Sequence, residues 1–225
     1  SLQASSLDSC FHENNLKQLL LHASFHFSMG SSEFKPLPPI VRVHDICNLV
    51  ALALLNITNV LYLAGKLNDG HALLYGSIAY FTADMFYVGI WPKCVKSPKI
   101  ILGHHICSGI LILIPLHYPR YIWCLSYCML VEVNTWLLIA KRTFSVGTEA
   151  LEVLFYLSWV LLRNIWYPYL TYIYYREWQA ETESLGSPWN VVLITPFFQA
   201  ALTGLNCYWT YNLWVQRSGR RMKQL

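Results

Sequence analysis

Six apolar stretches, each close to the length of a membrane span, divide this chain of 225 residues, and short polar segments separate them. A helix needs about 20 mainly apolar residues to cross the hydrocarbon core of a bilayer. We therefore predict an all-α polytopic membrane protein, a bundle of six transmembrane helices, with a kink at Pro168 in the fifth. The predicted spans are Ile46–Ala64, His71–Trp91, Ile100–Leu116, Tyr121–Ala140, Thr148–Tyr175 and Pro188–Trp214.

Composition excludes the ordinary soluble classes. Hydrophobic residues make up 55% of the chain and charged residues only 12%, whereas about a quarter of the residues of a soluble domain are charged. The net charge of +4 is small, and the basic residues fall in loops and tails. This distribution argues against nucleic acid and indicates membrane lipids as partners. The seven cysteines form no CxxC pair, so we expect reduced thiols.

Three regions follow from this pattern. Residues 1–40 are polar and end in a proline-rich segment, which predicts a partly disordered leader. An alternative for residues 16–27 within it is a short amphipathic helix lying on a membrane surface. Residues 41–216 form the membrane domain, and residues 217–225 form a basic tail.

The basic residues also predict the orientation of the bundle. If all six segments span, one side holds only Lys66, Arg120 and Arg176, and the opposite side holds most of the remaining positive charge. Basic loops are retained on the cytosolic side of a membrane. We therefore expect both termini to be cytosolic. The residues on the basic side are Lys17, Lys35, Arg42, Lys93, Lys96, Lys99, Lys141, Arg142, Arg217, Arg220, Arg221 and Lys223.

Ionisable residues inside three consecutive spans lie at one predicted depth. Asp84, His104 and Glu132 are each a few residues from the cytosolic end of their span. At about 1.5 Å per residue, all three are roughly 8 to 12 Å below the interface. A charge in hydrocarbon is costly and usually faces a bundle interior or a wet cavity. We therefore predict an intramembrane polar cavity that opens to the cytosol.

The histidine pair offers a catalytic and a structural interpretation. His104 and His105 point about 100° apart on a helix, so they cannot make the same contact. Asp84 could orient one imidazole and leave its second nitrogen free as a base or nucleophile. The alternative is a hydrogen-bonded pair that joins helices; the shared depth favours the functional interpretation. We expect no metal site, since ligands at i, i+3 or i, i+4 spacing are missing.

Arg163 lies near the middle of the fifth span, where a guanidinium needs a polar partner. Glu132 is the natural candidate for an ion pair, and Asn134 and Thr135 add hydrogen-bonding capacity. Two interpretations stay open: a structural ion pair that joins the fourth and fifth spans, or a substrate-binding set of Glu132, Asn134 and Arg163. Glu152 is expected to reach the interface.

Four short segments, taken in order, resemble the TLC domain family. They are YFTAD (Tyr80–Asp84), the pair His104–His105, EVNTWL (Glu132–Leu137), and Leu162–Arg163 followed by Pro168–Tyr169. The family includes ceramide synthases, translocating-chain-associating membrane proteins and a neuronal ceroid-lipofuscinosis protein of the endoplasmic reticulum. The resemblance extends over about residues 41–215 and implies a membrane domain of the endoplasmic reticulum.

The synthase branch of this family transfers an acyl group from acyl-CoA to a sphingoid base. If that activity carries over, His104 or His105 is the base or nucleophile and Asp84 its orienting partner, with acyl-CoA as co-substrate and no resident cofactor. This chain departs from that branch, because residues 126–135 contain one glutamate, Glu132, in place of a His-Asp-x-x-Asp segment. It looks closer to the TLC-domain-containing proteins linked to membrane lipid composition.

Three hypotheses for the function follow. The first is a lipid-handling membrane protein that acts on membrane lipid composition through the polar cavity. The second is an acyltransferase of ceramide synthase type. The third is a non-catalytic cargo receptor or scaffold of the endoplasmic reticulum, whose polar residues only hold helices together. The sequence predicts no oligomeric state.

Overall fold

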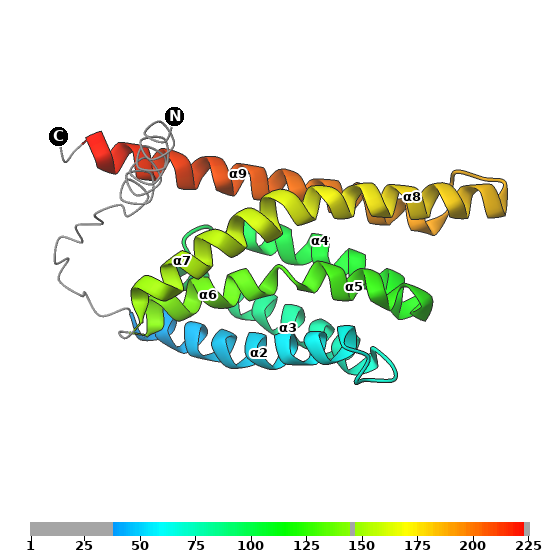
Figure 1. The fold of residues 1–225 in the computed structure, drawn as a ribbon. Coiled ribbons are helices and arrows are strands. Elements are labelled where there is room, and N and C mark those ends of the chain that lie inside the picture. Colours follow the sequence, from blue (N-terminus) through cyan, green and yellow to red (C-terminus); the bar gives the residue numbers. More distant parts are fainter. Residues whose placement is uncertain (1–37, 145–146, 223–225) are drawn as a thin grey trace, which may run out of the picture. The chain divides into compact units, whose positions relative to one another are not determined.

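The computed structural model describes residues 38–144 and 147–222, with side chains to residue 216. Within these ranges the chain is helical and contains no strand, which confirms the predicted all-α class. The expected leader falls almost entirely outside the described residues, as does the proposed surface helix at 16–27. The elements are α2 (Pro39–Leu63), α3 (His71–Ile90), η1 (Pro92–Cys94), α4 (Pro98–His117), η2 (Pro119–Tyr121), α5 (Ile122–Met129), α6 (Glu132–Thr143), α7 (Thr148–Ser158), the π-helix η3 (Trp159–Trp166), α8 (Tyr167–Leu185), η4 (Val191–Leu193) and α9 (Ile194–Met222) (Figure 1).

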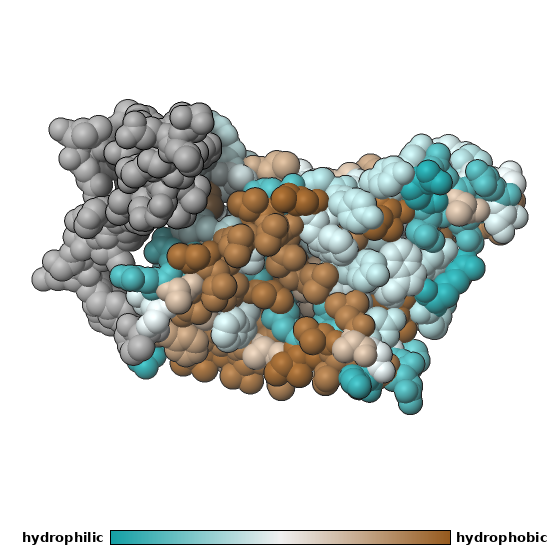
Figure 2. All heavy atoms as spheres, viewed as in Figure 1, coloured by the Kyte–Doolittle hydropathy of each residue, from teal (hydrophilic) through white to brown (hydrophobic). Residues whose placement is uncertain are grey.

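Five helical stretches are long and apolar enough to cross a membrane. The fifth predicted span is not among them, although residues 148–185 form one uninterrupted helix long enough to span. Its many tyrosines and its charged last turns make it less apolar than the others. Hydrophobic residues cover the middle of the face in Figure 2, and hydrophilic residues gather toward its ends, as in a bilayer protein. The five stretches are Pro39–Leu63, His71–Ile90, Pro98–His117, Pro119–Thr143 and Val191–Gln216.

Three predicted spans have clearly different ends in the structure. Helix α2 begins at Pro39 instead of Ile46, because a proline fits the first turn of a helix, where no backbone N–H is needed. This earlier start adds about two turns and brings His44 and Asp45 into the bundle. The helix of the fifth span continues past Tyr175 to Leu185. At the other end of the chain, α9 begins at Ile194, after a 3₁₀ turn, and continues to Met222 instead of ending near Trp214.

The helices pack in an order that places the fourth span inside. Helix α3 packs against α2 and α4, α4 against α9, and α9 against α8, while α6 lies between α2 and α7. Helix α5 contacts α2, α3, α4 and α8. In the stretch Pro119–Thr143, 56% of the window is buried, against at most 39% in the other four. The polar groups of this span are therefore held within protein and not in lipid.

Gly70 allows the start of α3 to approach α5 closely. A Cβ atom at this position would lie 2.1 Å from Cγ2 of Ile122 and 3.1 Å from the ring of Tyr62. Any side chain would therefore force α3 and α5 apart. The contact holds the non-basic end of the bundle together.

The fourth span is interrupted at Leu130 and Val131, between α5 and α6, where the sequence predicted one continuous helix. Irregular backbone at membrane depth is tolerated only where other protein groups satisfy it. Aromatic side chains from the next long helix do so here. Trp166 Nε1 donates to Tyr127 O at 3.0 Å, Tyr167 Oη to Cys128 O at 3.2 Å, and Tyr174 Oη to Cys124 O at 2.7 Å.

The predicted kink in the fifth span appears as a π-helix with a change of direction. Residues 159–166 adopt the wider π turn just before Pro168, and the ribbon bends between α7 and α8 (Figure 1). Pro168 has no N–H to continue the α-helical pattern, so the preceding backbone rearranges. Single π turns often lie at functional positions, and this one carries Arg163.

Candidate functional site

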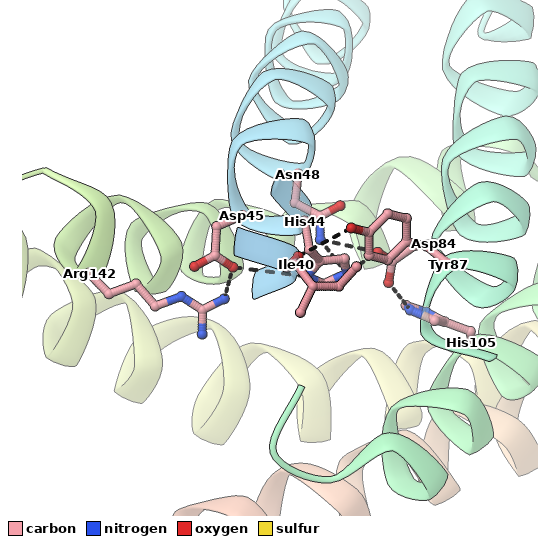
Figure 3. Close-up of polar contacts among 8 residues, drawn as sticks. All are labelled: Ile40, His44, Asp45, Asn48, Asp84, Tyr87, His105 and Arg142. Carbon is pink, nitrogen blue, oxygen red and sulfur yellow. Dashed lines mark hydrogen bonds and ion pairs between the residues drawn. The ribbon is translucent and has the colours of Figure 1, made fainter. Parts of the chain in front are cut away.

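Asp84 of α3 lies at the centre of a buried polar cluster (Figure 3). Its Oδ1 lies 2.7 Å from His44 Nε2 and accepts a hydrogen bond from Asn48 Nδ2 at 3.1 Å. Its Oδ2 lies 2.6 Å from His105 Nε2. All four side chains are buried. We call Asp84, His44, Asn48 and His105 the Asp84 centre; it joins α2, α3 and α4.

The two imidazoles of the Asp84 centre carry their protons on the same ring nitrogen, Nε2. An ionised carboxylate only accepts hydrogen bonds, so Nε2 of each ring carries the proton toward Asp84. The Nδ1 atoms of His44 and His105 are then left as lone-pair acceptors, and neither has a hydrogen-bond partner among the described residues. A buried base whose other nitrogen is held by a carboxylate is the arrangement used for proton abstraction and nucleophilic attack. The structure thus brings Asp84 and His105 together as the sequence predicted.

His104 does not join this centre. Its ring lies against Phe81, Trp209 and His105, with centroid separations of 6.5, 5.8 and 5.4 Å. Its Nδ1 is also buried without a partner among the described residues. The two adjacent histidines therefore face different surroundings, one a carboxylate and the other aromatic rings.

Sequence reasoning missed the contribution of α2. His44 lies just before the first predicted span and Asn48 lies within it, and both contact Asp84. The available signal was their spacing, since residues i and i+4 lie on one face of a helix. Asp45 on the same turn pairs with the half-exposed Arg142 of α6 (Figure 3).

Glu132 is the first residue of α6, directly after the break in the fourth span, and its side chain is only 5% exposed. It lines an internal cavity of about 40 Å³. A water molecule needs roughly 10 to 15 Å³ of such volume, so the cavity has room for a few waters or part of a narrow alkyl chain. Its walls are mainly apolar residues of α4 and α5, with Phe81 from α3, two tyrosines from α8, and Thr195 and Leu202 from α9.

Phe81 contacts both this cavity and the histidine pair. Its side chain lines the cavity, and its ring centroid lies 5.4 Å from that of His105. An apolar space with a carboxylate in its wall and the Asp84 centre therefore share one aromatic residue. These are the elements of a site for an amphiphilic molecule.

Arg163 has neutral partners in place of the expected ion pair. Its Nε donates to Asn134 Oδ1 at 2.7 Å, its Nη1 to Asn206 Oδ1 at 2.8 Å and its Nη2 to Thr135 Oγ1 at 3.0 Å. No ion pair between Arg163 and Glu132 occurs in the described chain. Because the guanidinium is buried, these amide and hydroxyl oxygens and two flanking indole rings stabilise its positive charge. Trp159 and Trp209 lie 4.9 and 5.5 Å from its Cζ.

We call Arg163 and its five partners the Arg163 cluster. Asn134 also donates to Phe155 O and to Ser158 Oγ, both at 2.9 Å. The cluster therefore joins α6, α7, the π-helix and α9. Its hydrogen bonds are made within the protein, and the cavity walls do not include Arg163.

No group of three or more histidine, cysteine, aspartate or glutamate side chains in the described ranges is arranged to hold a metal ion. In the Asp84 centre both Nε2 atoms point at carboxylate oxygens and not at a shared open position. The arrangement suits proton chemistry and hydrogen bonding.

Comparison with known proteins adds one finding. A sequence model described as the TLC domain matches residues 64–215 of the chain. The match begins after α2, so His44, Asp45 and Asn48 lie outside it, and the resemblance is narrower than the predicted 41–215. No curated protein sequence and no solved structure matches the chain significantly.

Proposed function

Because the chain belongs to the TLC domain family, we propose that it is a lipid-handling protein of the endoplasmic reticulum that acts on membrane lipid composition. Proteins with this domain are membrane proteins of lipid metabolism or lipid sensing, and the apolar helices make this one an integral multi-pass protein. In the proposal, the lipid places part of an alkyl chain in the internal cavity and its polar end near Glu132 and the Asp84 centre.

One observation carries the proposal: Phe81 lines an apolar cavity and also contacts His105 of a buried carboxylate–imidazole centre. An apolar cavity alone would serve packing, and a polar centre alone would serve helix association. Their combination fits a molecule with an alkyl chain and a polar end. In this proposal Glu132 contacts the lipid, and Asn134 and Arg163 act by holding α6 in place.

A test uses the cavity wall and a matched position on the same helix. Leu111 of α4 lines the cavity, whereas Leu113, two residues along, is 49% exposed on the outer face. We expect Leu111→Trp to lower the amount of lipid that co-purifies with the detergent-extracted protein by about fivefold, roughly 1 kcal/mol of binding. Leu113→Trp should leave it unchanged. Mass spectrometry of the extracted lipids, on folded protein isolated by size exclusion, is the measurement.

Equal lipid content in wild type, Leu111→Trp and Leu113→Trp would refute the cavity as the binding site. A loss in both variants would point to lipid bound on the outer surface. Lipidomics of cells with and without the protein identifies the lipid class that responds, including sphingolipids.

A second candidate is acyl transfer of ceramide synthase type, and the geometry of His105 favours it. Asp84 holds Nε2 at 2.6 Å while Nδ1 has no partner in the described part of the protein, as a general base requires. If this is the activity, purified protein converts acyl-CoA and a sphingoid base into an N-acyl product, and His105→Ala abolishes conversion while folding is retained. Lipid binding without any product would leave the first proposal and exclude this one.

A further inference from the structure

The second imidazole of the Asp84 centre, that of His44, has another carboxylate near its free nitrogen. Nε2 of His44 faces Asp84, and its Nδ1 lies 3.9 Å from Oδ1 of Asp45. His44 and Asp45 are both buried, at 5% and 1% exposure. Neither His44 Nδ1 nor Asp45 Oδ2 has a hydrogen-bond partner among the described residues. The proposed lipid contacts use neither group.

Asp45 connects this buried edge to the surface. Its Oδ1 pairs with Nη2 of Arg142, whose side chain is 40% exposed. Figure 3 shows the order along the series, with Arg142 and Asp45 on one side of His44 and Asp84 and His105 on the other. The groups that can both donate and accept protons run from Asp45 to His105, with one separation longer than a hydrogen bond. The Arg142 guanidinium only donates, so in this series the proton enters at Asp45 from water beside the exposed Arg142 side chain.

We propose that His44 and Asp45 exchange protons between the Asp84 centre and the surface of the protein. The inference rests on the proposed function only in taking the Asp84 centre as the working site. When Asp45 passes a proton to Nδ1 of His44, the proton on Nε2 moves to Oδ1 of Asp84. The His44 imidazole ends with the same number of protons, the Asp84 carboxyl group has gained one, and the Asp45 carboxyl group has lost one. The reverse steps release a proton to the surface.

The surroundings of the two histidines explain why His44 and not His105 has this role. His44 lies near a carboxylate at each of its two ring nitrogens. His105 has a carboxylate only at Nε2, and its ring otherwise packs near Phe81 and His104. A carboxylate stabilises the protonated imidazole that a proton relay passes through. The aromatic surroundings of His105 offer no such partner, so its Nδ1 stays available to a substrate.

Other groups around His44 are consistent with this role. The titratable or charged groups that its neighbours present are Asp45 on α2, Asp84 and Tyr87 on α3, Cys94 on η1, His105 on α4 and Arg142 on α6. The Tyr87 ring lies 5.1 Å from that of His44, and its hydroxyl donates to Ile40 O. Burial raises the pKa of the Cys94 thiol, so it stays protonated and neutral at physiological pH. Only the carboxylates can take a proton from His44.

The test is the rate at which the imidazole N–H protons exchange with water, followed by NMR on uniformly folded protein with ¹⁵N-labelled histidine. Asp45→Asn keeps the shape of the side chain but cannot carry a proton. We expect it to slow exchange at both His44 and His105 by at least about tenfold. Loss of a merely structural contact would loosen the packing and make exchange faster. The direction of the change therefore separates the two roles.

Three further variants complete the test. Asp45→Glu restores a carboxylate and should return exchange to near the wild-type rate. Asn59→Ala removes a buried polar contact of the same helix with Ser126, outside the Asp84 centre, and should not slow exchange. His44→Gln should slow exchange at His105. If Asp45→Asn does not fold, His44→Gln is the variant that decides the test. Unchanged or faster exchange in Asp45→Asn or His44→Gln would overturn the proposal; because no lipid is measured, that result leaves the proposed function intact.

Discussion

The Asp84 centre and the Arg163 cluster are both buried charges in one bundle, and they differ in what remains unpaired. Every nitrogen of the Arg163 guanidinium donates to a protein oxygen, and two tryptophan rings cover its faces. In the Asp84 centre the carboxylate is saturated, but both histidines keep a nitrogen without a partner in the described chain. The buried cation thus has all its nitrogens paired, although Nδ2 of its neighbour Asn206 has no partner among the described residues. The Asp84 centre instead leaves nitrogens of its basic groups open to another molecule.

The surroundings of the Asp84 centre and the Arg163 cluster also indicate a functional role for the first and a structural role for the second. Phe81 connects the Asp84 centre to the internal cavity, whereas the Arg163 cluster joins four helical segments and is not part of the cavity wall. The difference teaches that burial of a charge in a membrane bundle is not by itself a sign of function. Unused hydrogen-bonding capacity next to open space is the more informative observation.

The largest effect on stability is expected at Arg163. Arg163→Ala leaves the oxygens of Asn134, Asn206 and Thr135 without a donor and opens a space between the two tryptophans. We expect a loss of about 3 kcal/mol in the free energy of unfolding, because three buried hydrogen bonds and a large side chain are removed. Thermal unfolding in detergent and the yield of monodisperse protein measure this. A variant as stable as wild type would mean that the cluster is not structural.

Asp84→Asn should separate function from stability. The amide offers one acceptor and one donor where two imidazole N–H groups need two acceptors, so we expect a smaller loss of about 1 to 2 kcal/mol. Cellular lipid changes that depend on the protein should nevertheless disappear. Asp69→Asn, at an exposed aspartate in the turn before α3, is the matched control. If folding and lipid effect fell in strict proportion, the Asp84 centre would be a second structural cluster and the scaffold hypothesis would gain support.

Glu132→Gln should give a smaller change in stability. The amide keeps the size of the side chain, and the attraction that the carboxylate loses acts on Arg163 from beyond ion-pair distance, so the free energy of unfolding should change by about 1 kcal/mol or less. Lipid co-purification should still fall, since the variant alters the polar group in the cavity wall. Glu149→Gln, on the exposed start of α7, serves as control. Unchanged lipid content in Glu132→Gln would remove Glu132 from the proposed contact.

The arrangement of spans was largely predictable, because hydrophobic length and loop charge are local properties. The contact of Asp84 with His105 was also predictable, since both lie at similar depth on neighbouring helices. The contribution of His44 is not predictable from hydropathy, which predicts a first span from Ile46, whereas Pro39 starts the helix two turns earlier. A proline-rich segment predicts a linker, but proline also begins helices.

The partners of Arg163 could not be predicted from the sequence. Opposite charge made Glu132 the obvious choice, yet neutral oxygens on two distant segments fill the role. Their convergence depends on the rotation of α6 and α9, which periodicity does not give. The break at Leu130 is equally hidden, because it contains neither glycine nor proline. It persists because aromatic side chains of a later helix satisfy its carbonyls, which is a tertiary effect.

The smallest effect is expected at the exposed ion pair of Arg120 and Glu181, and it calibrates the comparison of the two buried groups. Arg120 Nη2 donates to Glu181 Oε1 at 2.7 Å, a shorter distance than two of the three bonds of Arg163, but the arginine side chain is 60% exposed. Water and salt screen such a pair, so Arg120→Gln should leave thermal unfolding and co-purified lipid unchanged. A loss comparable to that of Arg163→Ala would show that bond geometry, and not burial, sets the energy of these contacts. The distinction between the two buried groups would then have to rest on the cavity alone.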